Sequence, residues 1–288
     1  MTEAPPFTWT GEVDGRSPLL LSSAHSGTHM PAEFLQHVRL PVSILRRMED
    51  AHVHRLLADA DAPLLAATHA RAMLDLNRAG DEYDPAMFIG RTTPPPRITD
   101  RVRAGFGVIP RIVGPGHAIH DGRLPVEILT NRVGRMHRPF HSTLATALLR
   151  MREVHGFAVL LDCHSMPGMG SQGVDIVIGN RHGGSAVPAL SAWLRQEFMS
   201  TGLTVAMNQP YAGGYITTRY GQPETGVHAV QIEIARTLYM DQETLVPHAG
   251  FAPLAALLAR VIHRLLRALE GELAPMLAPA TALRAAAE

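Results

Sequence analysis

Short apolar runs alternate with amphipathic segments along most of the chain, and this alternation restricts the fold to one broad class. The runs with the length and composition of buried strands are Pro18–Ser23, Pro63–Thr68, Ala72–Leu76, Phe157–Asp162, Val174–Ile178, Leu203–Met207 and Ala229–Ala235. The segments with apolar residues at the helical period are Ser43–Ala60, Glu127–His155, Ser185–Thr201 and Phe251–Leu269. Because strands that alternate with helices build layered sheets, we predict an α/β fold with a mixed, mostly parallel sheet and helices on both faces.

The domain organisation follows from the same pattern. We expect a single α/β domain over residues 1–272, followed by an Ala-rich C-terminal tail over residues 273–288. The region 80–116 is rich in Gly, Pro, Asp and Arg, and it includes the sequence TTPPPR at 92–97. Long irregular connections of this kind in a compact domain are usually functional.

The composition excludes several classes of function. The 26 basic and 26 acidic residues cancel, so we expect neither nucleic acid nor a membrane as a partner. All 26 basic residues are arginine, which excludes lysine chemistry and leaves Arg or backbone N–H groups to hold an anionic substrate. Cys163 is the only cysteine, so an intrachain disulfide is excluded. Because no signal peptide or membrane-spanning stretch is recognisable, we expect a cytoplasmic protein.

Two histidines follow predicted strands, where the chemistry of α/β sheets collects. His25 leaves the first strand and enters a turn that contains Gly27; the alternative is an ordinary loop histidine beside a helix start. The run 158–161 leads to Asp162 and His164. Asp162 lies on the same side of an extended chain as His164 and could orient its imidazole. The alternative is a capping aspartate beside a histidine that is satisfied by hydrogen bonds.

A carboxylate interrupts the last apolar strand. Glu233 shares one face of this strand with Gln231, whereas the neighbouring positions are apolar. A buried carboxylate without a partner is costly, so a general base in a cleft is one interpretation. An ion pair with Arg236 or another arginine is the other.

Two further segments carry candidate substrate contacts. Asn77 and Arg78 end the predicted strand 72–76, and in a chain without lysine they form a natural fork for a substrate carboxylate. A surface arginine that caps the sheet is the alternative. Tyr215 and Arg219 lie beside a Gly-Gly pair in a segment typical of a mobile active-site loop, although a hairpin has the same composition.

Together, two histidines, a possible carboxylate ligand and a separate glutamate fit a catalytic zinc site with an open position for water. Other catalytic schemes have less support, because the sequence contains no nucleophile elbow, Walker loop, HExxH helix or dinucleotide fingerprint.

An ordered set of motifs resembles one known family, the N-formylglutamate amidohydrolases. The motifs are SAHSGTHMP (23–31), MEDAHVHRL (48–56), DLNR (75–78), GVIPR (107–111), RPFH (138–141), LLDCHSMP (160–167), PYAGGYITTRYGQP (210–223) and HAVQIEIARTLYMD (228–241). The family is similar in fold to zinc carboxypeptidases (phosphorylase/hydrolase-like) and to aspartoacylase-like deacylases.

The resemblance implies a role for each matching residue. His25 and His164 correspond to two metal ligands, Glu233 to the catalytic glutamate, and Asn77 with Arg78 to the pair that binds a substrate carboxylate. Further candidates for contacts with the substrate or with the scissile carbonyl are Arg111, Arg138, Arg219 and Tyr215.

The third metal ligand departs from the carboxypeptidase pattern. Thr28 stands where the His-x-x-Glu motif has its glutamate, so another residue must supply the ligand. We predict Asp50, with His29 and Glu49 as rivals. The metal is one divalent ion, taken to be zinc, with cobalt, manganese and iron left open.

The implied function is metal-dependent hydrolysis of N-formyl-L-glutamate to formate and L-glutamate, the last step of one histidine-degradation route. The alternatives are a deacylase or carboxypeptidase that acts on another small N-acyl amino acid, and a metal-free binding protein of the same fold. Neither alternative requires nucleic acid or a membrane, and the sequence does not fix the oligomeric state.

Overall fold

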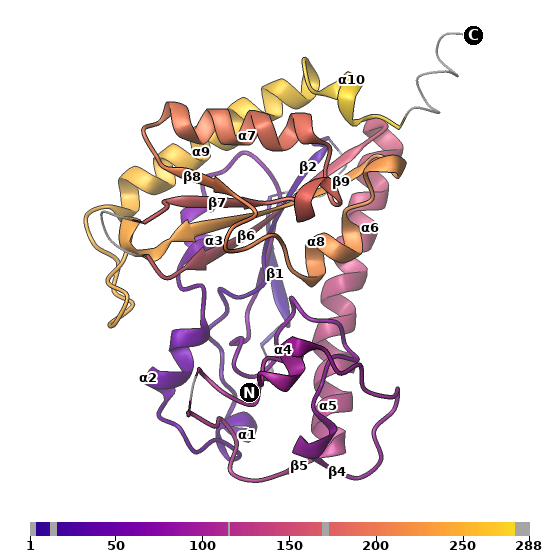
Figure 1. Ribbon diagram of the computed structural model, residues 1–288, viewed down its shortest axis with the longest axis vertical. Coiled ribbons are helices and arrows are strands. Elements are labelled where there is room, and N and C mark those ends of the chain that lie inside the picture. Colours follow the sequence, from indigo (N-terminus) through magenta and orange to yellow (C-terminus); the bar gives the residue numbers. More distant parts are fainter. Residues whose placement is uncertain (1–3, 12–15, 115, 169–172, 280–288) are drawn as a thin grey trace. The chain divides into compact units, whose positions relative to one another are not determined.

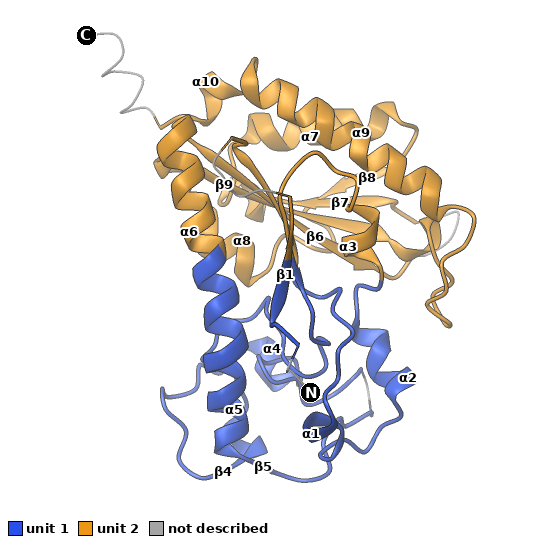
Figure 2. Ribbon diagram, turned by 180° about the vertical axis from the view of Figure 1, so that it is seen from behind, with its two compact units in different colours: residues 1–8, 24–51, 66–143 blue, residues 9–23, 52–65, 144–288 orange. Residues whose placement is uncertain are grey.

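The computed structural model describes residues 4–11, 16–114, 116–168 and 173–279. The chain folds as two compact units (Figure 2). The first comprises Met1–Thr8, Ala24–Ala51 and Ala66–Thr143, and the second comprises Trp9–Ser23, His52–Leu65 and Leu144–Glu288. Most of the Ala-rich tail, residues 280–288, lies outside the described residues, and the prediction of a single domain stays a prediction.

A seven-stranded sheet in the order β1-β3-β2-β6-β9-β7-β8 has most of its residues in the second unit. Its strands are β1 (Phe7–Thr10), β2 (Leu19–Ser23), β3 (Leu64–Ala67), β6 (Ala158–Met166), β7 (Ile176–Gly179), β8 (Val205–Met207) and β9 (Val227–Ala235). The pairs β2–β6, β6–β9 and β7–β8 are parallel, and β7–β9 is antiparallel. The predicted mixed, mostly parallel α/β sheet is therefore confirmed.

Apolar burial on both faces explains this sheet. Every residue of β6 is buried, as expected for a parallel strand that is covered on both sides. The helices of the second unit include α3 (Val53–Leu56), α7 (Pro188–Ser200), α8 (Tyr215–Tyr220), α9 (Phe251–Glu270) and α10 (Ala274–Leu277). Figure 1 shows α7 and α9 side by side over one face of the sheet and α8 on the other.

The first unit is built mainly from irregular chain. Its elements are α1 (Ala32–Leu35), α2 (Val42–Leu45), β4 (Phe88–Ile89), α4 (Asp100–Arg103), β5 (Leu124–Pro125) and α5 (Val126–Arg132). After α5, a π-helical turn at Val133–His137 leads into α6 (Arg138–His155). The predicted helix at 127–155 thus forms with one irregular turn. Within the described residues, every helix is too short or too polar to span a bilayer.

Three expectations of local structure are wrong. Ala72–Leu76 is a series of turns instead of a strand, although its residues are mostly buried. The predicted helix Ser43–Ala60 is broken after Met48, because the Asp50 N–H donates to the His25 carbonyl at 2.9 Å and His52 adopts a left-handed conformation with φ of 66°. The segment with Tyr215 and Arg219 is the short helix α8 instead of a loop or hairpin.

Candidate functional site

The carboxyl ends of β2 and β6 bring a serine, an aspartate and a histidine together. Ser22 lies opposite Asp162 in the parallel register, and the Ser22 hydroxyl donates to Asp162 Oδ1 at 2.6 Å. His164 Nε2 lies 2.9 Å from Asp162 Oδ2. Asp162 is fully buried, so these two contacts compensate for its loss of hydration. The contact with His164 is the one predicted to orient the imidazole.

Glu233 lies next to His164 on the adjacent strand β9. The two residues are partners in the parallel β6–β9 register, so their side chains project to the same side of the sheet. Gln231, two residues earlier, donates from Nε2 to Glu233 Oε1 at 2.7 Å. Glu233 is 8% exposed. Arg236, the alternative partner, donates from Nε to Ser165 Oγ at 3.1 Å.

His25 follows β2 by two residues and lies between two aspartates. Its Nε2 is 2.7 Å from Asp75 Oδ1, and its Nδ1 is 3.3 Å from Asp50 Oδ2. All three side chains are buried. Asp75 also accepts from Arg71 Nε at 3.0 Å and from the Asn77 N–H at 2.9 Å.

The charge state of Asp75 decides which His25 nitrogen carries a proton. Burial alone would raise the pKa of Asp75, but Arg71, His25 and Arg78 together hold that pKa well below its usual range. Ionised Asp75 can only accept hydrogen bonds, so in a neutral His25 the proton sits on Nε2. Nδ1 of this neutral form is an acceptor that faces Asp50 Oδ2, whereas a protonated His25 donates to both aspartates.

With His25 neutral, a cation shared by His25 Nδ1 and Asp50 Oδ2 would fit their separation. Zinc bonds to nitrogen and oxygen measure about 2.0–2.1 Å, so two ligands of a tetrahedral ion lie roughly 3.3–3.4 Å apart. The separation between His25 Nδ1 and Asp50 Oδ2 is 3.3 Å. His25, Asp50 and His164 form a buried group that could hold a metal ion, since each offers one ligand atom and these atoms all lie within 4.8 Å of one another. The donor set, two imidazoles and one carboxylate, suits a divalent transition metal.

The rivals of Asp50 as third ligand have other neighbours. The exposed His29 packs its ring against that of His69, with centroids 4.8 Å apart. Glu49 Oε2 accepts from Arg46 Nε at 3.1 Å. Cys163 is buried, and burial, followed by the charges of Asp162 and Glu233, raises the pKa of its thiol.

Arg78 is held by backbone carbonyl groups. It is buried and donates from Nε to the Phe106 carbonyl at 3.0 Å and from Nη1 to the Asn77 carbonyl at 2.7 Å. Burial lowers the pKa of Arg78, and the charge of Asp75 opposes that shift. Asn77 is also buried.

The other predicted substrate residues lie in more exposed places. Arg111 pairs with Asp84 at 3.5 Å and keeps a side-chain exposure of 45%. Arg138 is exposed at the start of α6. Arg219 is exposed on α8, where it donates to the Tyr215 hydroxyl at 3.0 Å. The described contacts of these three arginines do not involve His25, Asp50 or His164.

Several residues of this region carry no role in the sequence prediction. They are Arg71, Asp75, Gln231, His137 and His141. His137 Nε2 lies 2.7 Å from the Arg78 carbonyl, and His141 Nε2 lies 2.9 Å from the Leu76 carbonyl. The sequence does contain one signal for His137 and His141, because two histidines four residues apart on a predicted helix share one face.

Comparisons with known proteins relate the chain to enzymes named for N-formylglutamate. A family model described as N-formylglutamate amidohydrolase matches residues 17–240. A protein named N-formylglutamate deformylase from Pseudomonas aeruginosa is 32% identical over 270 residues, covering 88% of this chain and 93% of that protein. A protein of the same name from Pseudomonas putida is 30% identical over 241 residues, covering 79% and 84%.

Solved structures extend the comparison to the fold. The crystal structure of N-formylglutamate amidohydrolase from Ralstonia eutropha JMP134 is similar with a TM-score of 0.87 at 32% identity, covering 93% of this chain and 99% of that one. A protein from Agrobacterium tumefaciens shares the fold with a TM-score of 0.64 at 19% identity, covering 93% and 97%.

Proposed function

The chain belongs to the N-formylglutamate amidohydrolase family, and we propose that it hydrolyses N-formyl-L-glutamate to formate and L-glutamate with the help of one divalent metal ion, taken to be zinc. The observation that carries the proposal is the buried group of His25, Asp50 and His164, whose three ligand atoms all lie within 4.8 Å of one another. The identity with proteins named N-formylglutamate deformylase supports the choice of substrate.

We assign the ion to His25, Asp50 and His164. Each histidine has a carboxylate at its other ring nitrogen, Asp75 for His25 and Asp162 for His164. Such carboxylates fix the tautomer and the ring orientation of a metal-binding histidine and raise its basicity. When bound, the ion supplies Lewis-acid polarisation of the formyl carbonyl and lowers the pKa of a water molecule towards about 7.

Glu233 is the general base in this proposal. Its carboxylate takes a proton from the water that adds to the formyl carbon, and it returns a proton to the amide nitrogen as the C–N bond breaks. Water thus supplies the hydroxyl of formate and the extra proton of the amine. The hydrogen bond from Gln231 to Glu233 Oε1 supports this role, because it restrains the carboxylate beside His164.

Arginines hold the substrate carboxylates. Arg78, with Asn77 beside it, is our first choice, because a buried guanidinium binds a carboxylate strongly and with defined geometry. Arg111, Arg138, Arg219 and Tyr215 remain candidates for the second carboxylate or for the oxyanion that forms at the formyl carbon.

A substrate profile tests this function. Purified protein loaded with zinc is assayed for amine release from N-formyl-, N-acetyl- and N-succinyl-L-glutamate, and for formate release from the first. We expect the N-formyl compound to have the highest kcat/KM and a chelator to abolish turnover. A preference for another acyl group would replace the substrate assignment, and full activity without metal would contradict the mechanism.

The variant Glu233→Gln tests the general base. We expect it to retain the metal content of the wild type and to lose roughly two to four powers of ten in kcat, because the amide cannot accept the proton. Glu224→Gln, on the short 3₁₀ turn before β9, is the matched control and should keep wild-type kcat. Near-native turnover of Glu233→Gln would exclude the role.

A further inference from the structure

A cavity in the first unit carries a buried charge that the proposed reaction does not use. It has a volume of about 200 Å³ and is lined by residues of α1, of α5 and of the turn that follows α5. Phe34, Met73, Ile128 and Met136 give it apolar walls, and Arg132 contributes a cation. The residues that line it do not include His25, Asp50 or His164.

Arg132 is a buried charge without a counterion. The residue is 7% exposed, and its guanidinium donates from Nη1 to the Met73 carbonyl at 2.9 Å. The guanidinium carbon also lies 5.1 Å from the centre of the Phe34 ring. Among the described residues no carboxylate lies within ion-pair distance of Arg132, and its remaining N–H groups have no hydrogen-bond partner.

The environment of Arg132 is unfavourable for a cation. Burial lowers the pKa of Arg132 to about 10. Two neighbouring ionisable groups, His69 and His120, have pKa values lowered to about 4, first by burial, so they are neutral at pH 7 and offer no negative charge. A buried ion that lacks a partner is unfavourable because it loses its hydration, and a bound anion would offset that loss.

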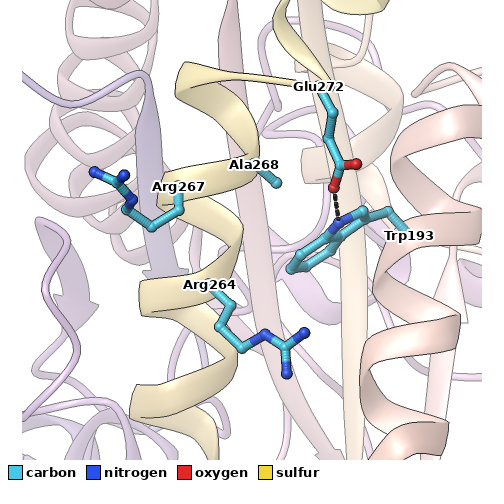
Figure 3. Close-up of a pocket in the computed structure, with 5 residues that line it drawn as sticks. All are labelled: Trp193, Arg264, Arg267, Ala268 and Glu272. Carbon is cyan, nitrogen blue, oxygen red and sulfur yellow. Dashed lines mark hydrogen bonds between the residues drawn. The ribbon is translucent and has the colours of Figure 1, made fainter.

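Another cavity provides a contrast. It lies between α7 and α9, has a volume of about 340 Å³ and is also lined by a ring and two arginines (Figure 3). There the Trp193 indole N–H donates to Glu272 at 2.8 Å, Arg264 pairs with Glu197 at 3.0 Å, and Arg267 pairs with Glu270 at 3.3 Å. Its charges are satisfied within the chain, whereas the charge of Arg132 is not.

We propose that the cavity at Arg132 binds a small monocarboxylate with a short apolar chain. The planar guanidinium matches a carboxylate through two parallel hydrogen bonds, and the apolar walls accommodate the chain. Among the lining residues Glu33 and Arg135 carry opposite charges and Arg132 adds one positive charge, so the net charge of the cavity matches a single carboxylate. This site is independent of the proposed hydrolysis.

Thermal unfolding and calorimetry with pentanoate test the site, with pentanamide as the uncharged probe of the same shape. Pentanoate should bind the wild type with saturation at one equivalent and raise its Tm. Pentanamide should bind at least roughly tenfold more weakly, because it cannot form the charge-assisted pair with Arg132. Arg132→Met should lose this preference. Arg150→Gln, an exposed arginine on α6, should keep it.

A second variant covers the case in which Arg132→Met does not fold. Ile128→Trp fills the cavity and leaves the guanidinium in place, and it should also abolish saturable binding of pentanoate. Binding of pentanoate with equal strength to the wild type and to either variant would overturn the site, as would the absence of saturable binding to the wild type. Activity on N-formyl-L-glutamate does not enter these outcomes.

Discussion

At the scale of single residues, the features that decide the chemistry are two histidines that each face a buried carboxylate. Asp75 and Asp162 occupy the Nε2 side of His25 and of His164, which leaves Nδ1 as the nitrogen that can face a metal ion. Each aspartate has further donors, Arg71 and the Asn77 N–H for Asp75 and Ser22 for Asp162. Removal of one carboxylate should therefore weaken metal binding without removing a ligand.

Asp162→Asn tests this expectation. We expect the dissociation constant of zinc to rise about 10- to 100-fold, as found when such supporting carboxylates are changed. Competition with a chromogenic chelator measures it, and Asp59→Asn, at an exposed position, is the control. Equal zinc affinity of Asp162→Asn and the wild type would show that the aspartate does not support a metal ligand.

Part of this arrangement could be predicted from the sequence. His164 and Asp162 are two residues apart on one strand, so strand geometry alone places them on the same side. The partner of His25 could not be found in this way, because Asp75 lies 50 positions along the chain and the segment that carries it forms turns. Long-range pairing through irregular chain has no periodic signal.

At the scale of elements, the π-helical turn and the start of α6 anchor the segment that presents Asp75 and Arg78. His137 and His141 lie on one helical face, and their Nε2 atoms contact the carbonyls of Arg78 and Leu76. Both histidines are buried. π-helical turns recur at functional sites, because they shift the side chains of one helical face.

His141→Phe should loosen this segment. Because one buried hydrogen bond is lost, we expect KM for N-formyl-L-glutamate to rise roughly 5- to 30-fold with a smaller change in kcat. His141→Gln retains an N–H donor and should restore part of the affinity, which a purely steric role would not predict. His263→Phe, exposed on α9, is the control. An unchanged KM for His141→Phe would remove the anchoring role.

Regular elements could be predicted where burial of apolar residues alone determines the structure. The strands β2, β6 and β9 are buried on both faces, so continuous apolar runs identify them. Ala72–Leu76 has the same composition but forms turns, because its backbone bonds to other segments, as when the Asp75 N–H donates to the Val108 carbonyl at 2.8 Å. The helical period at 43–60 was overridden in the same way by the bond from Asp50 to His25.

At the scale of the whole molecule, buried neutral histidines make stability depend on pH. The pKa of His120 is lowered from 6.5 to about 4, first by burial and then by the charge of Arg132. The unfolded chain therefore takes up a proton as the pH falls below about 6.5, while the folded chain does so only near 4. Stability from this group is complete above pH 6.5 and is lost progressively between these values.

His120→Phe tests this linkage, because phenylalanine keeps the edge-to-face contact with Phe34 but does not titrate. We expect the free energy of unfolding to fall less between pH 6.5 and 4 in this variant than in the wild type, as measured by urea denaturation. His117→Phe, at an exposed position, should follow the wild type. Parallel pH profiles of His120→Phe and the wild type would contradict the lowered pKa.

The fold class and the family were the most predictable properties of the whole chain. An ordered series of short motifs carried the resemblance, and the match of the family model to residues 17–240 confirms it. The division into two units was not predicted. Each unit is made of three separate segments of the chain, and no linker composition marks where one unit ends and the other begins.

Anomalous diffraction at the zinc edge, from crystals of protein that is active on N-formyl-L-glutamate, tests the central claim most directly. The account predicts one strong peak within bonding distance of His25 Nδ1, Asp50 and His164. An active crystal with its metal peak elsewhere, or with no peak at these three residues, would contradict the account.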